Sequence, residues 1–133
     1  MARTPIALAL LAGALTLPAT SFAHHSFAMF DQSKAIVLRG TIKEFRWVNP
    51  HVSLFIEVNE GAAKHGVWAV ELTSPGTLTR LGWSRKSLTV GEKVDIEVNP
   101  LRDGGLGGGF RKATILSTGQ VLQARLVEIE KAG

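Results

Sequence analysis

Two adjacent histidines, His24 and His25, stand directly after the small-x-small triplet Ser21-Phe22-Ala23. A cut after Ala23 gives His24 a free α-amine beside its imidazole, and these two nitrogens can chelate one metal ion. A further imidazole would complete an all-nitrogen site of the kind that suits Cu(II). The pattern therefore predicts that copper or another transition metal binds at a processed N-terminus. The alternative interpretation is a solvated start to the mature chain.

The residues before this pair have the pattern of a secretory signal peptide. Arg3 supplies a positive start, residues 5–19 are apolar, and the triplet ending at Ala23 provides the cleavage site. The apolar stretch is too short to cross a bilayer comfortably, since about 20 residues are needed. We predict that residues 1–23 are a signal peptide and that residues 24–133 form one exported, periplasmic domain. Cleavage after Ala19 is the alternative.

His51 is the third candidate metal ligand. It follows the Asn49-Pro50 turn and opens a strand whose aliphatic residues lie on the opposite face. Glu71 also lies off the apolar face of its own strand, and symmetric pairing of the two strands brings it only to a diagonal distance from His51. His51 therefore either lines a site or forms a hydrogen bond that fixes the turn. For Glu71 the alternative is a solvated or arginine-paired carboxylate. Trp47, Asn49 and Glu71 are the candidates for a binding face.

No convincing catalytic set is present in the sequence. It has no cysteine, no Gly-x-Ser-x-Gly elbow and no close pair of carboxylates, so we predict a protein that binds rather than transforms its ligand. Convergence of His51 and Glu71 in a pocket is the arrangement that would revive an enzyme. The run "DGGLGGG" (103–109) lacks the Gly-Lys-Ser/Thr ending of a phosphate loop. We expect it to be a flexible loop at the rim of a binding face.

Met29 is a further sulfur-bearing candidate near the two histidines. Its thioether can bind Cu(I), but its neighbours Phe27 and Phe30 favour a role as a core filler. The remaining histidine, His65, lies in a loop beside a lysine and a glycine, and we expect it to be exposed.

Charge and composition exclude several classes of protein. The chain has 15 basic and 11 acidic residues, and the charges are interspersed, so no surface for nucleic acid or membrane is predicted. Without cysteine there are no disulfides and no thiolate metal sites, so stability must come from packing. No second apolar run is long enough to span a membrane, and no internal repeat is visible.

The elements that must position these residues are mostly strands with alternating apolar residues. A long strand is expected over 35–47, with a β-bulge where the alternation slips between Ile42 and Phe45. A short helix is expected from Ser74 as N-cap and Pro75 at the first position to Gly82 beyond its end, with Trp83 packing back on the helix. The remaining strands are expected at 51–58, 67–72, 93–98 and 110–116, followed by a short apolar return at 121–122.

This order favours an all-β fold with one short helix, a small five-stranded antiparallel barrel of the OB type. Such a barrel has its helix between the third and fourth strands, and its ligand face lies between the loops joining strands one to two and four to five. Those loops correspond to residues 48–50 and 99–109. A seven-stranded sandwich is the alternative, but the chain offers too few strands for it.

Four segments are specific in combination: "AHHSFAMFD", "FRWVNPH", "WAVELTSPGTLTRLGW" and "LTVGEKVDI". They resemble a family of small exported bacterial proteins catalogued as a domain of unknown function (DUF6152). The resemblance covers nearly all of the chain after the predicted signal peptide and implies export and a small β-rich domain. It implies no activity, ligand or catalytic residue. The positions that recur in the resemblance are His24, His25, Trp47, Asn49, Pro50, His51, Glu71, Ser74, Pro75 and Trp83.

Two functions follow from the sequence. The first is a periplasmic binding module that holds copper or another transition metal through His24, His25 and His51. The alternative is a module without metal that binds an envelope protein, a peptide or a glycan through its barrel face and loops. Neither function involves nucleic acid or a membrane span in the mature chain.

Overall fold

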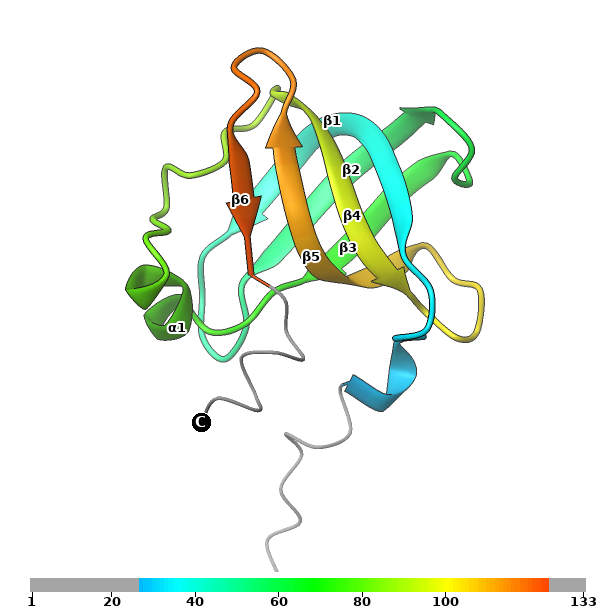
Figure 1. Ribbon diagram of the computed structural model, residues 1–133, viewed down its shortest axis with the longest axis horizontal. Helices are drawn as coiled ribbons and strands as arrows, with labels where there is room; N and C mark the ends of the chain where they lie inside the picture. The colour runs from blue at the N-terminus through cyan, green and yellow to red at the C-terminus, as the bar shows by residue number, and fades with distance from the viewer. Residues whose placement is uncertain (1–26, 125–133) are drawn as a thin grey trace, which may run out of the picture.

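Six strands and two short helical segments follow one another in residues 27–124, the part of the chain that the computed structural model describes (Figure 1). They are the 3-10 helix η2 (Phe27–Met29), β1 (Ile36–Arg46), β2 (Ser53–Glu60), β3 (Gly66–Glu71), α1 (Pro75–Arg80), β4 (Lys93–Pro100), β5 (Gly107–Ile115) and β6 (Val121–Gln123). This order is the predicted one, with strand ends displaced by up to a few residues.

Five of these strands close into a barrel. The sheet order is β3-β2-β1-β4-β5-β6, and a further pairing joins β3 to β5. This last pairing is parallel and short, since it matches Ala69 with Gly107, Val70 with Gly108 and Glu71 with Gly109. The other four pairings within the barrel are antiparallel. The predicted OB-like barrel is therefore confirmed, although one of its pairings is parallel, and β6 lies outside it, paired with β5.

The bend of β1 allows the barrel to close. The first half of β1 pairs with β4 and its second half with β2, and the register with β2 slips after Arg39 and again after Ile42. The second slip is the predicted β-bulge. Bulges raise the local twist, which a strand shared by two sides of a barrel requires. Gly40 lies at the bend so close to the carbonyl of Glu57 that no side chain fits there.

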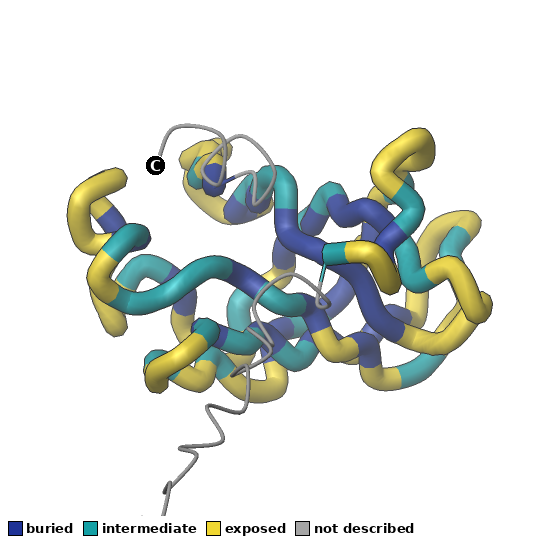
Figure 2. The backbone as a smooth tube through the Cα atoms, turned by 90° about the horizontal axis from the view of Figure 1, so that it is seen from below, coloured by how far each residue is buried: buried dark blue, intermediate teal, exposed yellow. Residues whose placement is uncertain are grey.

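The core follows from alternation along the strands. On β2 the buried residues are Leu54, Ile56 and Val58, and on β4 they are Val94, Ile96 and Val98. Because successive side chains of a strand point to opposite faces, the residues between them face outward. Figure 2 shows the buried stretches in the interior of the barrel and the exposed ones at the loops. Trp68 and Trp83 join this core.

The short helix α1 begins and ends as its sequence predicts. The Ser74 side chain accepts a hydrogen bond from the backbone nitrogen of Thr77 at 3.2 Å, and Pro75 is the first helical residue. At the other end Gly82 has a φ of 88°, and the nitrogen of Trp83 donates to the carbonyl of Leu78 at 3.0 Å, which completes a Schellman motif. Within residues 27–124, no helix is long and apolar enough to cross a bilayer.

The glycine run is where the structure departs most from the prediction. Gly107, Gly108 and Gly109 are not part of a flexible loop, because they are buried and form the start of β5. There β5 pairs with β4 on one side and β3 on the other. A Cβ on Gly108 would lie 2.8 Å from both the Asn99 carbonyl oxygen and a methyl of Val98. Glycine is therefore needed to close the barrel, since only a backbone without side chains fits there.

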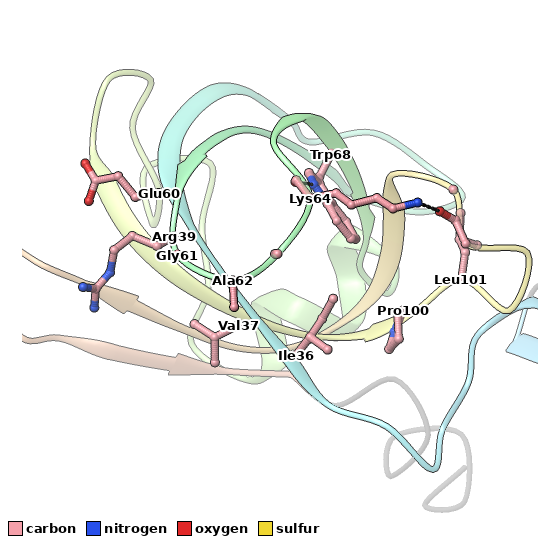
Figure 3. A pocket seen from close by; sticks show the side chains of 13 residues that line it. Ile36, Val37, Arg39, Glu60, Gly61, Ala62, Lys64, Trp68, Pro100 and Leu101 are labelled. Carbon is pink, nitrogen blue, oxygen red and sulfur yellow. Dashed lines mark hydrogen bonds between the residues drawn. The ribbon is translucent and has the colours of Figure 1, made fainter.

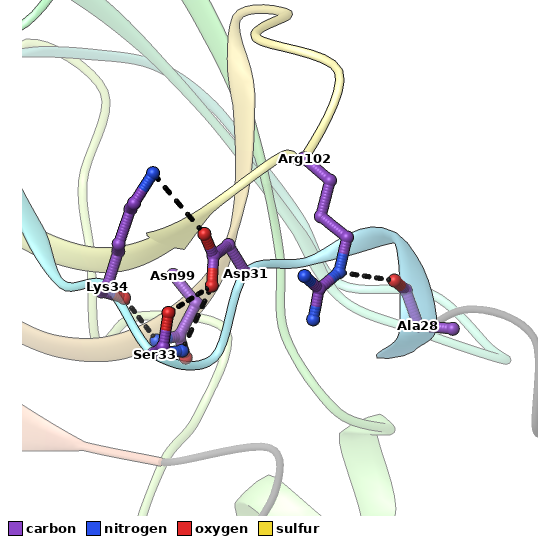
Figure 4. A network of polar contacts seen from close by, with 6 residues as sticks. All are labelled: Ala28, Asp31, Ser33, Lys34, Asn99 and Arg102. Atoms are coloured by element: carbon purple, nitrogen blue, oxygen red, sulfur yellow. Dashed lines mark hydrogen bonds and ion pairs between the residues drawn. The ribbon is translucent and has the colours of Figure 1, made fainter.

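An N-terminal strap, residues 27–34, is tied to the loop between β4 and β5 (Figure 4). Arg102 Nε donates to the Ala28 carbonyl at 3.0 Å, and the Arg102 backbone nitrogen donates to the Met29 carbonyl at 2.9 Å. Asn99 Nδ2 donates to the Lys34 carbonyl at 2.7 Å, and Phe30 is buried in a bridge with Leu101. These contacts attach the segment that follows His24 and His25 to the barrel.

Candidate functional site

His51 and Glu71 form a close pair on the outer face of the barrel. The distance from His51 Nδ1 to Glu71 Oε1 is 2.7 Å, and both side chains are largely covered, with exposed fractions of 35% and 26%. A nitrogen and a carboxylate oxygen at this distance need a proton between them. The contact is an ion pair when the imidazole is protonated, and Nε2 is the ring nitrogen that Glu71 does not engage.

The register of β2 and β3 explains why these two side chains meet. Glu71 is paired with Ser53, and Val70 with Leu54. The symmetric pairing expected from the sequence was one residue off, since it placed Glu71 nearer Leu54. Opposite Ser53, Glu71 lies on the same face as His51, two residues before Ser53 in the chain. A shift of one residue would have turned the carboxylate toward the other face.

The pair lies in a pocket of about 450 Å³. The floor is the outer face of β2 and β3, with Ser53, Phe55 and Ala69, and one wall comes from the turn after β1, with Asn49 and Pro50. The opposite wall comes from the β4–β5 loop and the N-terminal strap. In OB barrels the β2–β3 face between the β1–β2 and β4–β5 loops is the usual ligand surface. The pocket therefore occupies the position that the fold predicts for a ligand.

The electrostatics of the pair depend on its burial. Burial raises the pKa of the Glu71 carboxyl above its ordinary value, and the charge of the neighbouring His51 opposes this rise. Removal of a carboxylate from water disfavours its ionised form unless a partner compensates. Glu71 is therefore a half-buried acid whose ionised form is favoured by the charge of His51.

This arrangement gives the His51 imidazole a defined chemistry. A carboxylate beside one ring nitrogen orients the ring and leaves the other nitrogen to face a ligand. Nε2 can then bind a metal ion or accept a proton. In the described residues 27–124, no group of three or more histidine or acidic side chains is close enough to hold a metal.

The other predicted site residues are distributed unevenly. Asn49 lines the His51 pocket, with a cis peptide bond to Pro50. Trp47 does not line it but packs against the core, with its ring 5.8 Å from that of Phe45 in an edge-on arrangement. His65 is exposed, as expected. His24 and His25 lie outside the described residues.

Three pocket residues had not been singled out for this role. Met29 is 48% exposed and lines the pocket, so the expectation that it fills the core is wrong. Arg46 lies over the ring of Phe55, 5.0 Å from its centroid, and both line the pocket. The alternation in β2 places Phe55 on the same face as His51 and Ser53, and this was the available signal.

The chain matches the model of a family of unknown function, DUF6152, over residues 12–111. It therefore belongs to this family, as the resemblance of its segments indicated. Searches of curated proteins and of solved structures found no match to the chain.

Proposed function

We propose that this protein is an exported, periplasmic binding module that holds copper or another transition metal through His24, His25 and His51. The observation that carries the proposal is the 2.7 Å contact between His51 Nδ1 and Glu71 Oε1. Histidines that bind metals usually give their second ring nitrogen to a carboxylate, a carbonyl or water. Glu71 would serve as this orienting group, and His51 Nε2 would be the ligand.

The N-terminal strap supports the participation of His24 and His25. Met29 lines the His51 pocket and is tied to the barrel through Arg102. His25 precedes Met29 by four residues, and an extended chain of that length spans at most about 14 Å. A segment of this length is long enough to bring His25 to the pocket, and the exposed Met29 thioether is available to Cu(I).

Affinity for the metal should fall steeply on acidification. The ligands must lose their protons to bind, and an unperturbed α-amine has a pKa of about 7.7 to 8.0. The amine exists at this place only if the signal peptide is removed after Ala23. N-terminal sequencing of the exported protein would establish this point.

Titration calorimetry with Cu(II) on the protein that begins at His24 tests the proposal. We expect affinity tighter than micromolar, and a loss of about tenfold or more in the His51→Gln variant. Glu71→Gln should weaken binding about tenfold, as loss of an orienting partner does. His65→Gln is the matched control, because His65 is exposed and does not line the pocket. Micromolar or weaker affinity, equal binding by the His51 and His65 variants, or no effect of one extra N-terminal residue would each refute the site.

The second candidate is a module that binds a peptide, a glycan or an envelope protein without metal. It is favoured by the apolar lining of the same pocket, since Met29, Val48 and Leu106 are all exposed there and Phe55 forms its floor. Capture from envelope extract that persists in chelator but is lost in Phe55→Ala would support it. Capture that chelator abolishes would support the metal site instead. Shortening of the glycine run is unsuitable as a test, because it would break β5.

A further inference from the structure

A second pocket, of about 690 Å³, lies beside the start of β1, the loop between β2 and β3, and the end of β4 (Figure 3). The contributing residues include Ile36 and Val37 of β1, Trp68 of β3, and Pro100 and Leu101 of the β4 end. The volume is within the range of roughly 300–1,000 Å³ of small-molecule sites, and barrel mouths are a frequent place for them.

The lining is mainly hydrocarbon. The single polar atom of the Trp68 side chain, Nε1, donates to the Lys64 carbonyl at 2.8 Å, so the indole offers the pocket only its apolar ring. Val37 is 53% exposed at the rim, and Ala62 and Ala63 are too small to fill the mouth. An apolar chain placed here would remove mainly Val37 and Ala62 from water, since Trp68 is only 4% exposed, and such burial is favourable roughly in proportion to the area covered.

The two basic residues at the rim of this pocket, Arg39 and Lys64, differ in their partners. On one side Arg39 donates two hydrogen bonds to Asp95, of 2.6 and 2.7 Å, and interacts with the charge of Glu60. The positive charge of Arg39 is therefore already compensated. On the other side Lys64 reaches across to the Gly104 carbonyl at 3.4 Å (Figure 3). Within the described residues, Lys64 forms no ion pair with a carboxylate.

We propose that this barrel mouth binds a medium-chain carboxylate, with its alkyl chain over Trp68 and its head group at Lys64. The long contact from Lys64 Nζ to a neutral carbonyl can be exchanged for a shorter one to a carboxylate, in which both partners are charged. Of the two cations that line the pocket, Lys64 is the one with no carboxylate partner among residues 27–124, and it matches one carboxylate. Two acidic side chains belong to this end of the barrel: Glu60, which lines the pocket, and Asp103, whose Oδ1 accepts from the Gly105 nitrogen at 2.8 Å.

Two substitutions test the head group in opposite directions. Calorimetry with decanoate should show about tenfold weaker binding in Lys64→Gln, since a hydrogen bond to a charged group is lost. Asp103→Asn should bind decanoate more tightly, because it removes a like charge and keeps the oxygen that accepts from Gly105. Lys86→Gln is the matched control, because Lys86 is exposed and lies outside the pocket. Decyltrimethylammonium, of equal chain length, should bind at least about tenfold more weakly than decanoate.

The position of the alkyl chain of the ligand is tested separately. Decanoate should shift the indole N–H resonance of Trp68 and leave that of Trp83 in place, and Ala62→Trp, which fills the mouth, should abolish binding. His51→Gln should have no effect, which separates this site from the metal proposal. Equal binding of the decyl cation, equal affinity of the Lys64 and Lys86 variants, or tight binding by Ala62→Trp would overturn the inference.

Discussion

Ser53 and Glu71 are directly paired across the β2–β3 ladder, and this pairing brings the Glu71 carboxylate to His51, two residues before Ser53. The contact at the centre of the proposed site is thus a consequence of strand register. Neither residue is adjacent to the other in sequence, and a shift of one position would separate them.

Replacement of Glu71 by glutamine should stabilise the protein near neutral pH. The pKa of this carboxyl is raised by burial, so its contribution to stability is fully present below its ordinary value of 4.5 and is lost as pH rises through the folded value. At pH 7 the ionised group therefore costs stability. We expect Glu71→Gln to gain roughly 0.5 kcal/mol at pH 7 and nothing at pH 3. Urea unfolding at both pH values measures this.

The matched control for Glu71→Gln is Glu57→Gln. Glu57 is 48% exposed and lies 3.2 Å from Lys43, so its loss removes a surface ion pair. Such pairs contribute little, and no gain is expected. A loss of stability at pH 7 in Glu71→Gln would contradict the burial argument.

The pair of Glu97 and Arg111 should show the opposite dependence on pH. The hydrogen bond from Arg111 Nε, at 2.7 Å, lowers the pKa of the Glu97 carboxyl below its ordinary value of 4.5. This contribution to stability is present above that value and is lost as pH falls through the lower folded value. Glu97→Gln should lose less than about 1 kcal/mol at pH 7 and flatten the acid limb of the unfolding curve. An unchanged acid limb in this variant would show that Glu97 does not account for the loss of stability at low pH.

Replacement of Gly40 by alanine should destabilise the barrel. The new Cβ would collide with the backbone carbonyl of Glu57 at the bend of β1, where nothing can move without breaking the β1–β2 pairing. Overpacking of this kind costs about 1–3 kcal/mol. Gly76→Ala is the matched control, since its Cβ meets only Arg80 Nη1 at 3.9 Å and alanine favours the helix. Urea midpoints that move in the same direction for both would refute the close approach at Gly40.

Arg102→Met should loosen the N-terminal strap without unfolding the barrel. The substitution removes the contact from Arg102 Nε to the Ala28 carbonyl, worth about 1 kcal/mol. Faster hydrogen exchange is expected at Asp31, whose nitrogen donates to the Pro100 carbonyl, and not at the β2 amides. If the metal proposal is right, affinity for Cu(II) should also fall. Arg85→Met, in an exposed loop, is the control.

Most of the fold could be predicted because its signals are local. Alternation in 53–60 and 93–100, the Ser74 cap and the Gly82 stop each depend on residues within one turn or one strand. The register slip after Ile42 was visible in the sequence as a one-residue break in the alternation of apolar residues along a single strand. The whole order of elements then selects the OB-like barrel, because few closed β folds place a helix between the third and fourth strands.

The glycine run shows where local reasoning fails. Taken alone, "DGGLGGG" reads as flexible, because glycine has the greatest conformational freedom of any residue. In the fold, Gly107 and Gly108 are buried between strands that come from residues 69–71 and 98–100. Their requirement for glycine is steric and comes from neighbours that are distant in sequence. Met29 was misjudged for a similar reason, since its exposure depends on where Arg102 and Leu101 hold the strap.

The sequence by itself determined the strands, the cap, the bulge and the list of residues able to bind a metal, because these depend on residue type and short spacing. Only the tertiary structure decided that His51 meets Glu71, that the glycines close the barrel, and that Lys64 spans a second pocket. These are contacts between segments far apart in the chain. Their geometry is set by register and closure, and a difference of one residue in pairing is enough to create or abolish them.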